Sequence, residues 1–307
     1  MDGHQLPAPW VRQQPLVGDA STRSYSRLWD SQGASAILVC YPEDICWQIE
    51  RDLEVRAWCE LHGVRVPALL EHPPGSGLAV IEDLGQADAE QALRKAPPSE
   101  RATMTSRLIE PLVVLADIAT SELPPWNRPL DATRLRWELA GFELWFLRHR
   151  NDAPPTVAVS SWLDDLATEI DHHPKRVCHR DYHLNNLFFL ASGEVAVIDF
   201  QDILVGPDTY DIVSLLHERA MPHLLGSRQQ SEAMELWARQ GRVDDGWELR
   251  ARQVRLQRAL KVLGSFARFE ATGKSAYAPW MLALAREVLP DLQAAGAPPD
   301  LTDLLLD

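Results

Sequence analysis

The chain has 307 residues, of which 46% are hydrophobic and 24% are charged, the proportions of an ordinary globular protein. A chain of this length can bury a large core, which excludes disordered and fibrous architectures. The 44 acidic residues outnumber the 30 Lys and Arg residues, and the resulting net charge of −14 argues against nonspecific binding to nucleic acid.

The first 85 residues predict a small lobe that is mostly β-structure. Apolar side chains recur at every fourth position of the segment 43–62, which is typical of a helix, and Gly63 is a favoured residue for its end. The expected elements are, in chain order, a polar lead-in at 1–17, strands at 24–30 and 34–42 around a turn at 30–33, the helix at 43–62, and a strand at 78–84.

Residues 86–307 predict a second, larger lobe that is mostly helical. In the segment 256–269, Leu256, Leu260, Leu263 and Phe266 share one helical face, which is typical of core packing. The stretch 177–205 differs and predicts a loop, a strand, a turn at 192–193, a second strand and a loop. The expected helices span 99–120, 131–149, 159–172, 208–220, 229–240, 246–272 and 275–295.

The stretch 177–205 also concentrates polar residues. Asp181 and Asn186 lie five positions apart, and Asp199 follows the apolar run 195–198. Phosphoryl transfer needs a carboxylate that accepts the proton of the attacking hydroxyl, together with hard oxygen ligands for Mg²⁺. Each residue alone is typical of a turn or a strand end. Their order and spacing together favour three such oxygens around one cleft.

The motifs HRDYHLNN (179–186) and VIDFQD (197–202) resemble the catalytic and metal-binding segments of the aminoglycoside phosphotransferase superfamily, relatives of protein kinases. Four blocks further resemble the bacterial anomeric sugar kinases of cell-wall recycling, which phosphorylate N-acetylmuramate and N-acetylglucosamine at C1. The resemblance implies an α+β, protein-kinase-like bilobal fold with a small β-rich N-lobe (1–85) and a larger, mostly helical C-lobe (86–307). The blocks are GDASTRSYSR (18–27), IEDLG (81–85), the segment 179–216 and LQRALKVLGSFAR (256–268).

The resemblance implies specific roles in the catalytic block. Asp181 would be the catalytic base, Asn186 and Asp199 would bind Mg²⁺, and His179 would support the catalytic loop. Asp211 opens a helix, where a carboxylate is expected to cap backbone N–H groups, and the resemblance implies that it braces the catalytic loop.

Three further residues of this block are candidates for the substrate cleft. His183 and Asn185 could line it or be structural. Asp202 could contact the metal or the sugar, and a role in the turn is the alternative.

Ser21, Thr22 and Arg23 lie where the kinase fold places its phosphate-covering turn. Arg23 is the sharpest candidate because its guanidinium can hold phosphate oxygens; the alternative is a surface residue. Glu82 and Leu84 begin the connection between the lobes, which in this fold presents backbone groups to adenine.

The third strand of the kinase pattern ends in V-x-K, but residues 36–41 contain no Lys. The sugar kinases also lack this Lys, so its absence favours that subgroup and leaves Arg23 as the leading substitute. Glu50 and Glu54 on the following helix would be the usual partners of that Lys. Without it, we expect them to face solvent or to pair with neighbouring arginines.

We interpret the chain as an ATP- and Mg²⁺-dependent kinase that phosphorylates the anomeric hydroxyl of N-acetylhexosamines. An amino sugar and a nucleotide are the expected partners, and Arg136 is a candidate for the carboxylate of N-acetylmuramate. No run of 18 apolar residues and no N-terminal apolar segment occur, so we expect no membrane partner and a cytoplasmic location.

Two alternatives stay open. One is another small-molecule kinase of the same fold, with an aminoglycoside, choline-like or thiosugar acceptor. The negative net charge of the chain would suit a cationic acceptor. The other is a nucleotide-binding pseudokinase. The missing Lys motivates it, and the intact set of Asp181, Asn186 and Asp199 argues against it.

Overall fold

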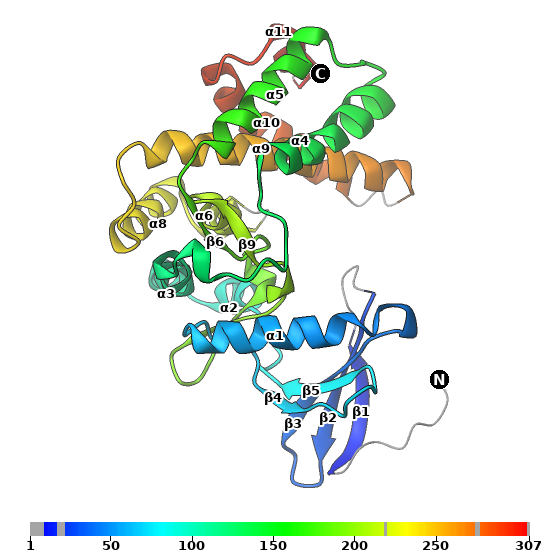
Figure 1. Ribbon diagram of the computed structural model, residues 1–307. Helices are drawn as coiled ribbons and strands as arrows, with labels where there is room; N and C mark the ends of the chain where they lie inside the picture. Colours follow the sequence, from blue (N-terminus) through cyan, green and yellow to red (C-terminus); the bar gives the residue numbers. More distant parts are fainter. Residues whose placement is uncertain (1–8, 17–21, 218–219, 274–276, 306–307) are drawn as a thin grey trace. The chain divides into compact units, whose positions relative to one another are not determined.

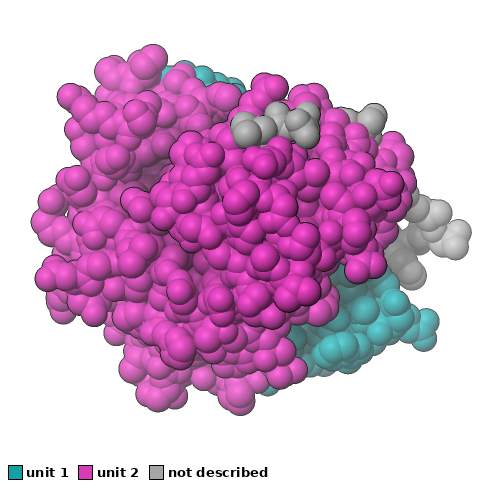
Figure 2. Space-filling view, turned by 90° about the horizontal axis from the view of Figure 1, so that it is seen from above, with its two compact units in different colours: residues 1–96, 184–201 teal, residues 97–183, 202–307 magenta. Residues whose placement is uncertain are grey.

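The computed structural model of the chain divides into two compact units, which Figure 2 colours separately. Unit 1 comprises 1–96 and 184–201, and unit 2 comprises 97–183 and 202–307. The segment 184–201, which carries three of the predicted site residues (Asn185, Asn186 and Asp199), therefore belongs to the first unit. The structure describes residues 9–16, 22–217, 220–273 and 277–305.

Unit 1 is built on a five-stranded antiparallel sheet with the strand order β1-β2-β3-β5-β4 (Figure 1). Alternating side chains of the central strands form a buried cluster of Leu28, Ala36, Leu38 and Val80. The strands are β1 (Trp10–Leu16), β2 (Ser24–Asp30), β3 (Ser35–Cys40), β4 (Leu69–Glu71) and β5 (Leu78–Glu82).

The predicted strands at 24–30, 34–42 and 78–84 are confirmed, but the prediction of a lead-in at 1–17 is wrong for part of that segment. Residues Trp10–Leu16 pair with β2 as an edge strand. Their five central residues are all exposed, so no hydrophobic alternation signals the strand. The guanidinium of Arg12 lies 3.6 Å from the centre of the Trp29 ring and covers it.

The predicted helix at 43–62 is present as a short 3₁₀ turn, η1 (Glu43–Ile45), followed by α1 (Gln48–Leu61). Gly63 follows α1 with a φ of +77°, a left-handed conformation that glycine adopts without strain. The buried side of α1 includes Asp52 together with Ile49 and Val55. One carboxylate of this helix thus points inward.

The segment 184–201 adds a hairpin to unit 1. After the 3₁₀ turn η4 (Leu184–Asn186), strand β7 (Leu187–Phe189) pairs antiparallel with β8 (Val195–Val197), and Gly193 provides the left-handed turn residue with a φ of +96°. The N–H of Val197 donates to the carbonyl of Arg65 at 2.8 Å, which joins the hairpin to the loop before β4. Helix α2 (Ala89–Lys95) contacts η4 and β7.

Unit 2 is mostly helical, and its longest helix, α9 (Trp247–Ala271), contacts the helices α4, α5, α6 and α10 and the π-helical segment η3. Strands β6 (Lys175–Cys178) and β9 (Leu204–Pro207) pair antiparallel. The remaining helical elements are α3 (Pro98–Asp117), η2 (Thr120–Glu122), α4 (Ala132–Gly141), η3 (Phe142–Arg150), α5 (Val157–Asp171), α6 (Tyr210–Leu216), α7 (Met221–Leu224), α8 (Ser227–Gln240), α10 (Ala278–Ala294) and α11 (Pro299–Leu304).

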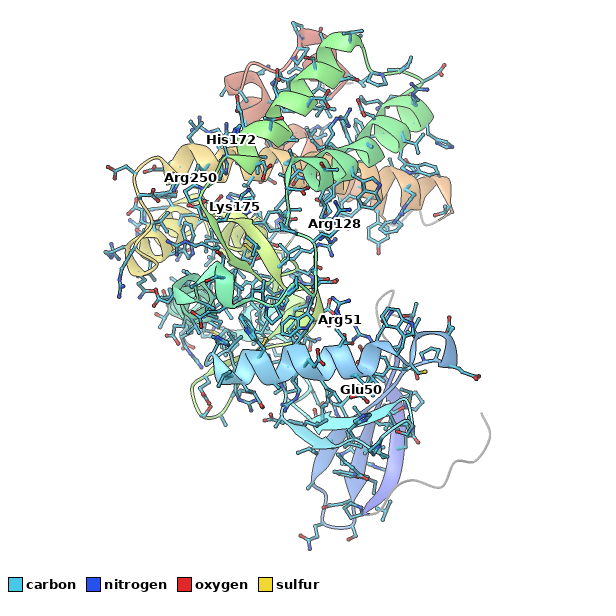
Figure 3. All side chains as sticks on the ribbon, in the orientation of Figure 1. Glu50, Arg51, Arg128, His172, Lys175 and Arg250 are labelled. Atoms are coloured by element: carbon cyan, nitrogen blue, oxygen red, sulfur yellow. The ribbon has the colours of Figure 1, made fainter. Side chains whose placement is uncertain are left out.

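Two ion pairs anchor one end of this small two-stranded sheet, where Lys175 lies opposite Pro207. Lys175 at the start of β6 pairs with Asp171 at 2.8 Å, and Arg250 of α9 pairs with Asp208 at 2.8 Å (Figure 3 labels Lys175 and Arg250). Residues 179–183, which follow β6, therefore continue from an anchored strand.

The small sheet-based unit and the larger helical unit confirm the expected α+β class. Within the described residues, no helix combines the length and the apolar character needed to cross a bilayer.

Candidate functional site

The predicted catalytic loop of unit 2 is held by Asp211, in the first turn of α6. Its carboxylate accepts hydrogen bonds from the backbone N–H groups of His179 at 2.6 Å and Arg180 at 2.9 Å. The His179 ring is buried and lies edge-on to Tyr182, whose hydroxyl donates to the carbonyl of Leu108 at 2.7 Å. The bracing role expected of Asp211 is thereby confirmed.

Asp181, the predicted base, lies in this braced loop, and its carbonyl accepts a hydrogen bond from the His183 N–H at 3.1 Å. Burial alone would raise the pKa of Asp181. The positive charges of Arg180, Lys261 and Arg258 outweigh burial and lower the pKa below its ordinary value. The carboxylate is therefore ionised at neutral pH, the state that a proton acceptor needs.

Two other predicted substrate residues lie in unit 2, in different surroundings. The Asp202 carboxylate, about two-fifths exposed, lies 3.4 Å from Nη1 of Arg180, the residue before Asp181. Arg136 instead pairs with Glu143 at 2.9 Å and with Asp164. A carboxylate of an acceptor would have to compete with both of these partners for Arg136.

The two predicted metal ligands lie at the same end of the β7–β8 hairpin in unit 1. The carbonyl of Asn186 accepts a hydrogen bond from the Ile198 N–H at 2.9 Å, which places Asn186 beside the residue that precedes Asp199. Asp199 has a φ of +62°, a conformation that costs energy for a residue other than glycine and that is frequent at functional sites. Its carboxylate accepts from Gln201 at 2.7 Å, and the Gln201 carbonyl accepts from Arg51 at 3.2 Å (Figure 3 labels Arg51).

An amide and a carboxylate are hard oxygen donors, which suit Mg²⁺. Among the described residues, no group of three or more His, Cys, Asp or Glu side chains could hold a metal ion alone. Mg²⁺ usually keeps several waters and takes only one or two protein carboxylates together with phosphate oxygens. Asn186 and Asp199 therefore fit a magnesium ion that arrives with a nucleotide.

Arg23, the predicted phosphate residue, is held by two neighbours in unit 1. Its Nη1 donates to the Asp52 carboxylate at 2.9 Å, and the Tyr41 hydroxyl donates to the same carboxylate oxygen at 2.8 Å. Burial alone would lower the pKa of Arg23, but Tyr25, Tyr41 and Asp52 raise it above its ordinary value. The other end of the guanidinium, Nη2, lies 3.6 Å from Asp199.

Sequence reasoning missed Asp52 and Tyr41. In the stretch Val39-Cys40-Tyr41, Tyr41 stands where the kinase pattern V-x-K has its Lys. Glu50, one of the two expected partners, is exposed and pairs with His72 at 3.2 Å. The spacing of Ile49, Asp52 and Val55 on one helical face was the available signal for an inward carboxylate.

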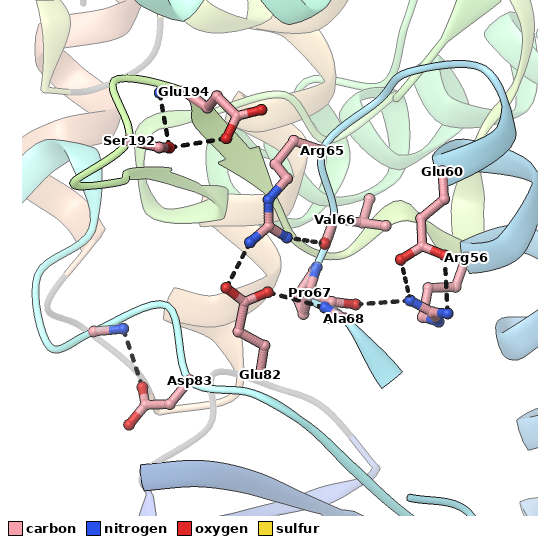
Figure 4. Close-up of polar contacts among 11 residues, drawn as sticks. Arg56, Glu60, Arg65, Val66, Pro67, Ala68, Glu82, Asp83, Ser192 and Glu194 are labelled. Carbon is pink, nitrogen blue, oxygen red and sulfur yellow. Dashed lines mark hydrogen bonds and ion pairs between the residues drawn. The ribbon is translucent and has the colours of Figure 1, made fainter. Parts of the chain in front are cut away.

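The segment after β5, predicted to contact adenine, is fixed by side chains on both sides. Glu82 accepts hydrogen bonds from Arg65 and from the Ala68 N–H (Figure 4). Asp83 pairs with Arg27 at 2.7 Å and accepts the Gly85 N–H at 3.0 Å. The backbone groups of Leu84, between Asp83 and Gly85, have no hydrogen-bond partner in the part of the chain that the structure describes. They are available to a ligand.

The remaining predicted residues are placed as follows. Ser21 lies outside the described residues, and Thr22 is an exposed residue of a bend. The side-chain amide of Asn185 donates to Asp88 at 3.0 Å and to Glu90 at 3.2 Å, which links the hairpin segment to the start of α2. Unit 1 thus brings Arg23 and Asp199 together, and unit 2 brings Asp202 to Arg180, beside Asp181.

Comparison with known proteins gives a match over most of the chain. Residues 12–252 match the profile of the Phosphotransferase enzyme family. The N-acetylmuramate/N-acetylglucosamine kinase of Neisseria meningitidis is 29% identical over 276 residues, which are 86% of this chain and 80% of that protein. The protein of the same name from Pseudomonas aeruginosa is 28% identical over 277 residues, 86% of this chain and 78% of that protein.

Solved structures share the fold at lower identity. Choline kinase LicA from Streptococcus pneumoniae has a TM-score of 0.64 and 11% identity, over 94% of this chain and 95% of that one. Amicoumacin kinase, in a complex with AMP-PNP, Ca²⁺ and Ami, has a TM-score of 0.58 and 15% identity, over 86% of this chain and 82% of that one. These likenesses show the kinase-like fold.

Proposed function

Because the chain belongs to the Phosphotransferase enzyme family and is a kinase with an alcohol group as acceptor, we propose that it phosphorylates the anomeric hydroxyl of N-acetylhexosamines. The phosphoryl donor is ATP with a divalent cation, and the product is the sugar 1-phosphate. N-acetylglucosamine and N-acetylmuramate are the acceptors to test first, because two relatives that match 86% of the chain are named for them.

Asp181 is the proposed proton acceptor. Its neighbouring cations keep it ionised and lower its pKa, which also makes it a weak base. A weak base suits an anomeric hydroxyl, which is more acidic than the other hydroxyls of a sugar. The half-buried carboxylate of Asp181, whose pKa is lowered by neighbouring cations, carries the proposed chemistry.

Asn186 and Asp199 are the proposed ligands of Mg²⁺. When bound, Mg²⁺ neutralises charge on the phosphate oxygens. Arg23, directed by Asp52 toward Asp199, offers a fork that can hold the same phosphates. The chain's part in the reaction is then positioning and charge neutralisation, which a loose transition state requires most.

The other predicted residues complete the proposal. Leu84, two residues after Glu82, would offer adenine its backbone groups, which have no hydrogen-bond partner among the described residues. Ser21 and Thr22 would cover the phosphates. His183 lies two residues after Asp181, and Asp202 pairs with Arg180, the residue before Asp181. Both would contact the acceptor sugar. The solved amicoumacin kinase complex, which contains a nucleotide analogue and Ca²⁺, supports a nucleotide and a divalent cation in this fold.

The test is the position of the transferred phosphate. Incubation with ATP, Mg²⁺ and N-acetylglucosamine should give a product whose ³¹P and ¹³C NMR spectra place the phosphate on C1. The 1-O-methyl glycoside lacks only the anomeric hydroxyl and should be inert, while 6-deoxy-N-acetylglucosamine should react. Turnover of the methyl glycoside would overturn the anomeric assignment.

The net charge of −14 favours one second candidate, a kinase for a cationic small alcohol of the choline type. The same assay with choline and an aminoglycoside as acceptors separates the candidates. A kcat/KM for a cationic acceptor more than about tenfold above that for either N-acetylhexosamine would favour the second candidate.

A further inference from the structure

The segment 256–268 carries polar side chains that the proposed mechanism leaves without a role. Gln257 and Lys261, one turn apart on α9, both donate to the carboxylate of Glu138 on α4. Lys261 donates to one oxygen at 2.8 Å, and Gln257 donates to the other at 3.0 Å. Glu138 is almost completely buried, with 2% of its side chain exposed.

The close approach of α9 to the end of α4 depends on Gly264. A Cβ atom at this position would lie 2.6 Å from the backbone nitrogen of Phe142, where α4 changes to the π-helical segment η3. Real Cβ atoms essentially never approach backbone that closely. The glycine thus permits the close packing of the two helices on which Glu138 and Lys261 face each other.

Glu138 also reaches the catalytic loop. The carboxylate oxygen that accepts from Lys261 lies 3.7 Å from Nη2 of Arg180, the residue before Asp181. Arg180 has a φ of +79°, a left-handed conformation that a glycine would adopt without strain. Its guanidinium lies between the carboxylates of Glu138 and Asp202. The side chain therefore supplies ion pairs that a glycine could not form.

Oppositely charged side chains surround Glu138, and none of them is in the exposed class. The Arg258 guanidinium donates to the Ser214 hydroxyl at 2.6 Å and lies 4.6 Å from the centre of the Tyr210 ring. Removing one member of such a cluster leaves an unpaired buried charge, while removing an oppositely charged pair leaves the net charge of the cluster unchanged. The cluster contains four carboxylates and three cations: Glu138, Asp181, Asp202, Asp211, Arg180, Arg258 and Lys261.

We propose that Glu138 is a positioning residue for the phosphoryl transfer. It fixes α9 to α4 through Lys261 and Gln257, and it holds Arg180 in the conformation that presents Asp181 to the acceptor hydroxyl. The proposal rests on the proposed function only in taking Asp181 as the proton acceptor. Glu138 acts through Arg180 and touches neither the sugar nor the nucleotide.

Three variants test this role: Glu138→Gln, Lys261→Met and the double variant. Each single variant leaves an unpaired buried charge and should lower the melting temperature. The double variant removes both charges and should regain most of the wild-type melting temperature. Its kcat should stay about 100-fold below wild type, because Arg180 still lacks Glu138, one of its two carboxylate partners, and Asp181 is misplaced. The KM for ATP should stay within about twofold.

Hydrogen exchange gives a second readout that does not depend on turnover. The backbone amides of His179 and Arg180 should exchange faster in the double variant than in the wild-type chain, since the loop is less ordered. Glu287→Gln is the matched control, because Glu287 also pairs with a cation of α9, Arg255, at 2.7 Å. The control should leave kcat and the loop exchange unchanged.

Recovery of both the melting temperature and kcat in the double variant would overturn the proposal and make Glu138 a purely structural residue. If the single variants fail to fold, the double variant alone decides. The assay uses whichever acceptor the wild-type chain phosphorylates. An error in the proposed sugar would therefore appear in the wild-type acceptor panel and would leave this comparison intact.

Discussion

The guanidinium of Arg23 and the carboxylate of Asp52, separated by 29 positions in the sequence, form a hydrogen-bonded ion pair with an N–O distance of 2.9 Å. In protein kinases, the corresponding ion pair joins a Lys of the third strand to a Glu of the following helix. Here Tyr41 stands at the Lys position of the V-x-K pattern and donates to the same Asp52 oxygen at 2.8 Å. The cation comes from the residue before β2, and the carboxylate from the buried side of α1.

This pair predicts coupled effects on nucleotide use. Arg23→Ala should raise the KM for ATP and lower kcat, because loss of a charge-assisted contact is worth about 1.5–3 kcal/mol, or roughly 10- to 150-fold in kcat/KM. Asp52→Asn should act in the same direction, and the double variant should lose less than the sum of the two single losses. Steady-state kinetics with varied ATP measures all three.

Glu60→Gln is the control for the Arg23–Asp52 pair. Glu60 also lies on α1 and pairs with an arginine, Arg56, at 2.6 Å, but on the exposed side of the helix. It should change kcat/KM for ATP by less than about twofold. Strictly additive losses in the Arg23–Asp52 cycle would contradict the coupling.

Removal of the proposed base should separate catalysis from binding. Asp181→Asn keeps the shape of the side chain but cannot take up the proton, so kcat should fall about 10²–10⁴-fold. Calorimetric binding of ADP with Mg²⁺ should stay close to that of the wild-type chain. Retention of more than a tenth of the wild-type kcat would remove Asp181 from this role.

Asp199 should instead control the metal dependence of binding. In Asp199→Ala the affinity for ADP should no longer increase on addition of Mg²⁺, while the affinity for metal-free ADP should be retained. Titration calorimetry with and without EDTA makes this comparison. If Mg²⁺ strengthens ADP binding to Asp199→Ala as much as to the wild-type chain, another residue holds the metal.

The sequence predicted the elements whose patterns are local. Strand β2 alternates, β3 and β5 are short apolar runs, and the HRDYHLNN block carries the predicted catalytic loop within eight residues. Strand β1 was missed because its exposed polar residues show no alternation. Asp52 was missed because a carboxylate inside a helix ordinarily indicates the solvent side.

The contacts of Glu138 could not be predicted for a different reason. Glu138 and Lys261 are separated by 123 positions, and only the packing of α9 on α4 brings them together. The motif 256–268 was visible in the sequence, but a helix pattern alone does not tell which partner a polar residue meets. Local patterns predicted the catalytic loop, and long-range packing determines how the loop is held.

Two glycines at the same helix contact should respond oppositely to alanine. Gly264→Ala places a Cβ against the backbone of Phe142 and should destabilise the chain by about 1–3 kcal/mol. Gly141 has ordinary helical angles, and a Cβ atom added there would meet no atom within 4 Å. Gly141→Ala should therefore stabilise the chain by about 0.5–1 kcal/mol through helix propensity. Urea unfolding measures both, and equal shifts would refute the steric explanation.

His217, at the end of α6, should make stability depend on pH. Burial, reinforced by Arg255 and Arg258, lowers its pKa from 6.5 to about 3. The unfolded chain therefore binds the proton more readily, so this contribution to stability is complete above about pH 6.5 and is lost as the pH falls toward 3. Between about pH 7.5 and about pH 5.5 the loss should be about 1.4 kcal/mol. In urea unfolding at the two pH values, His217→Gln should lack this part of the change, and the exposed-residue control His149→Gln should retain it. If His217→Gln and the wild-type chain show the same pH dependence, the pKa of His217 is not lowered in the folded chain.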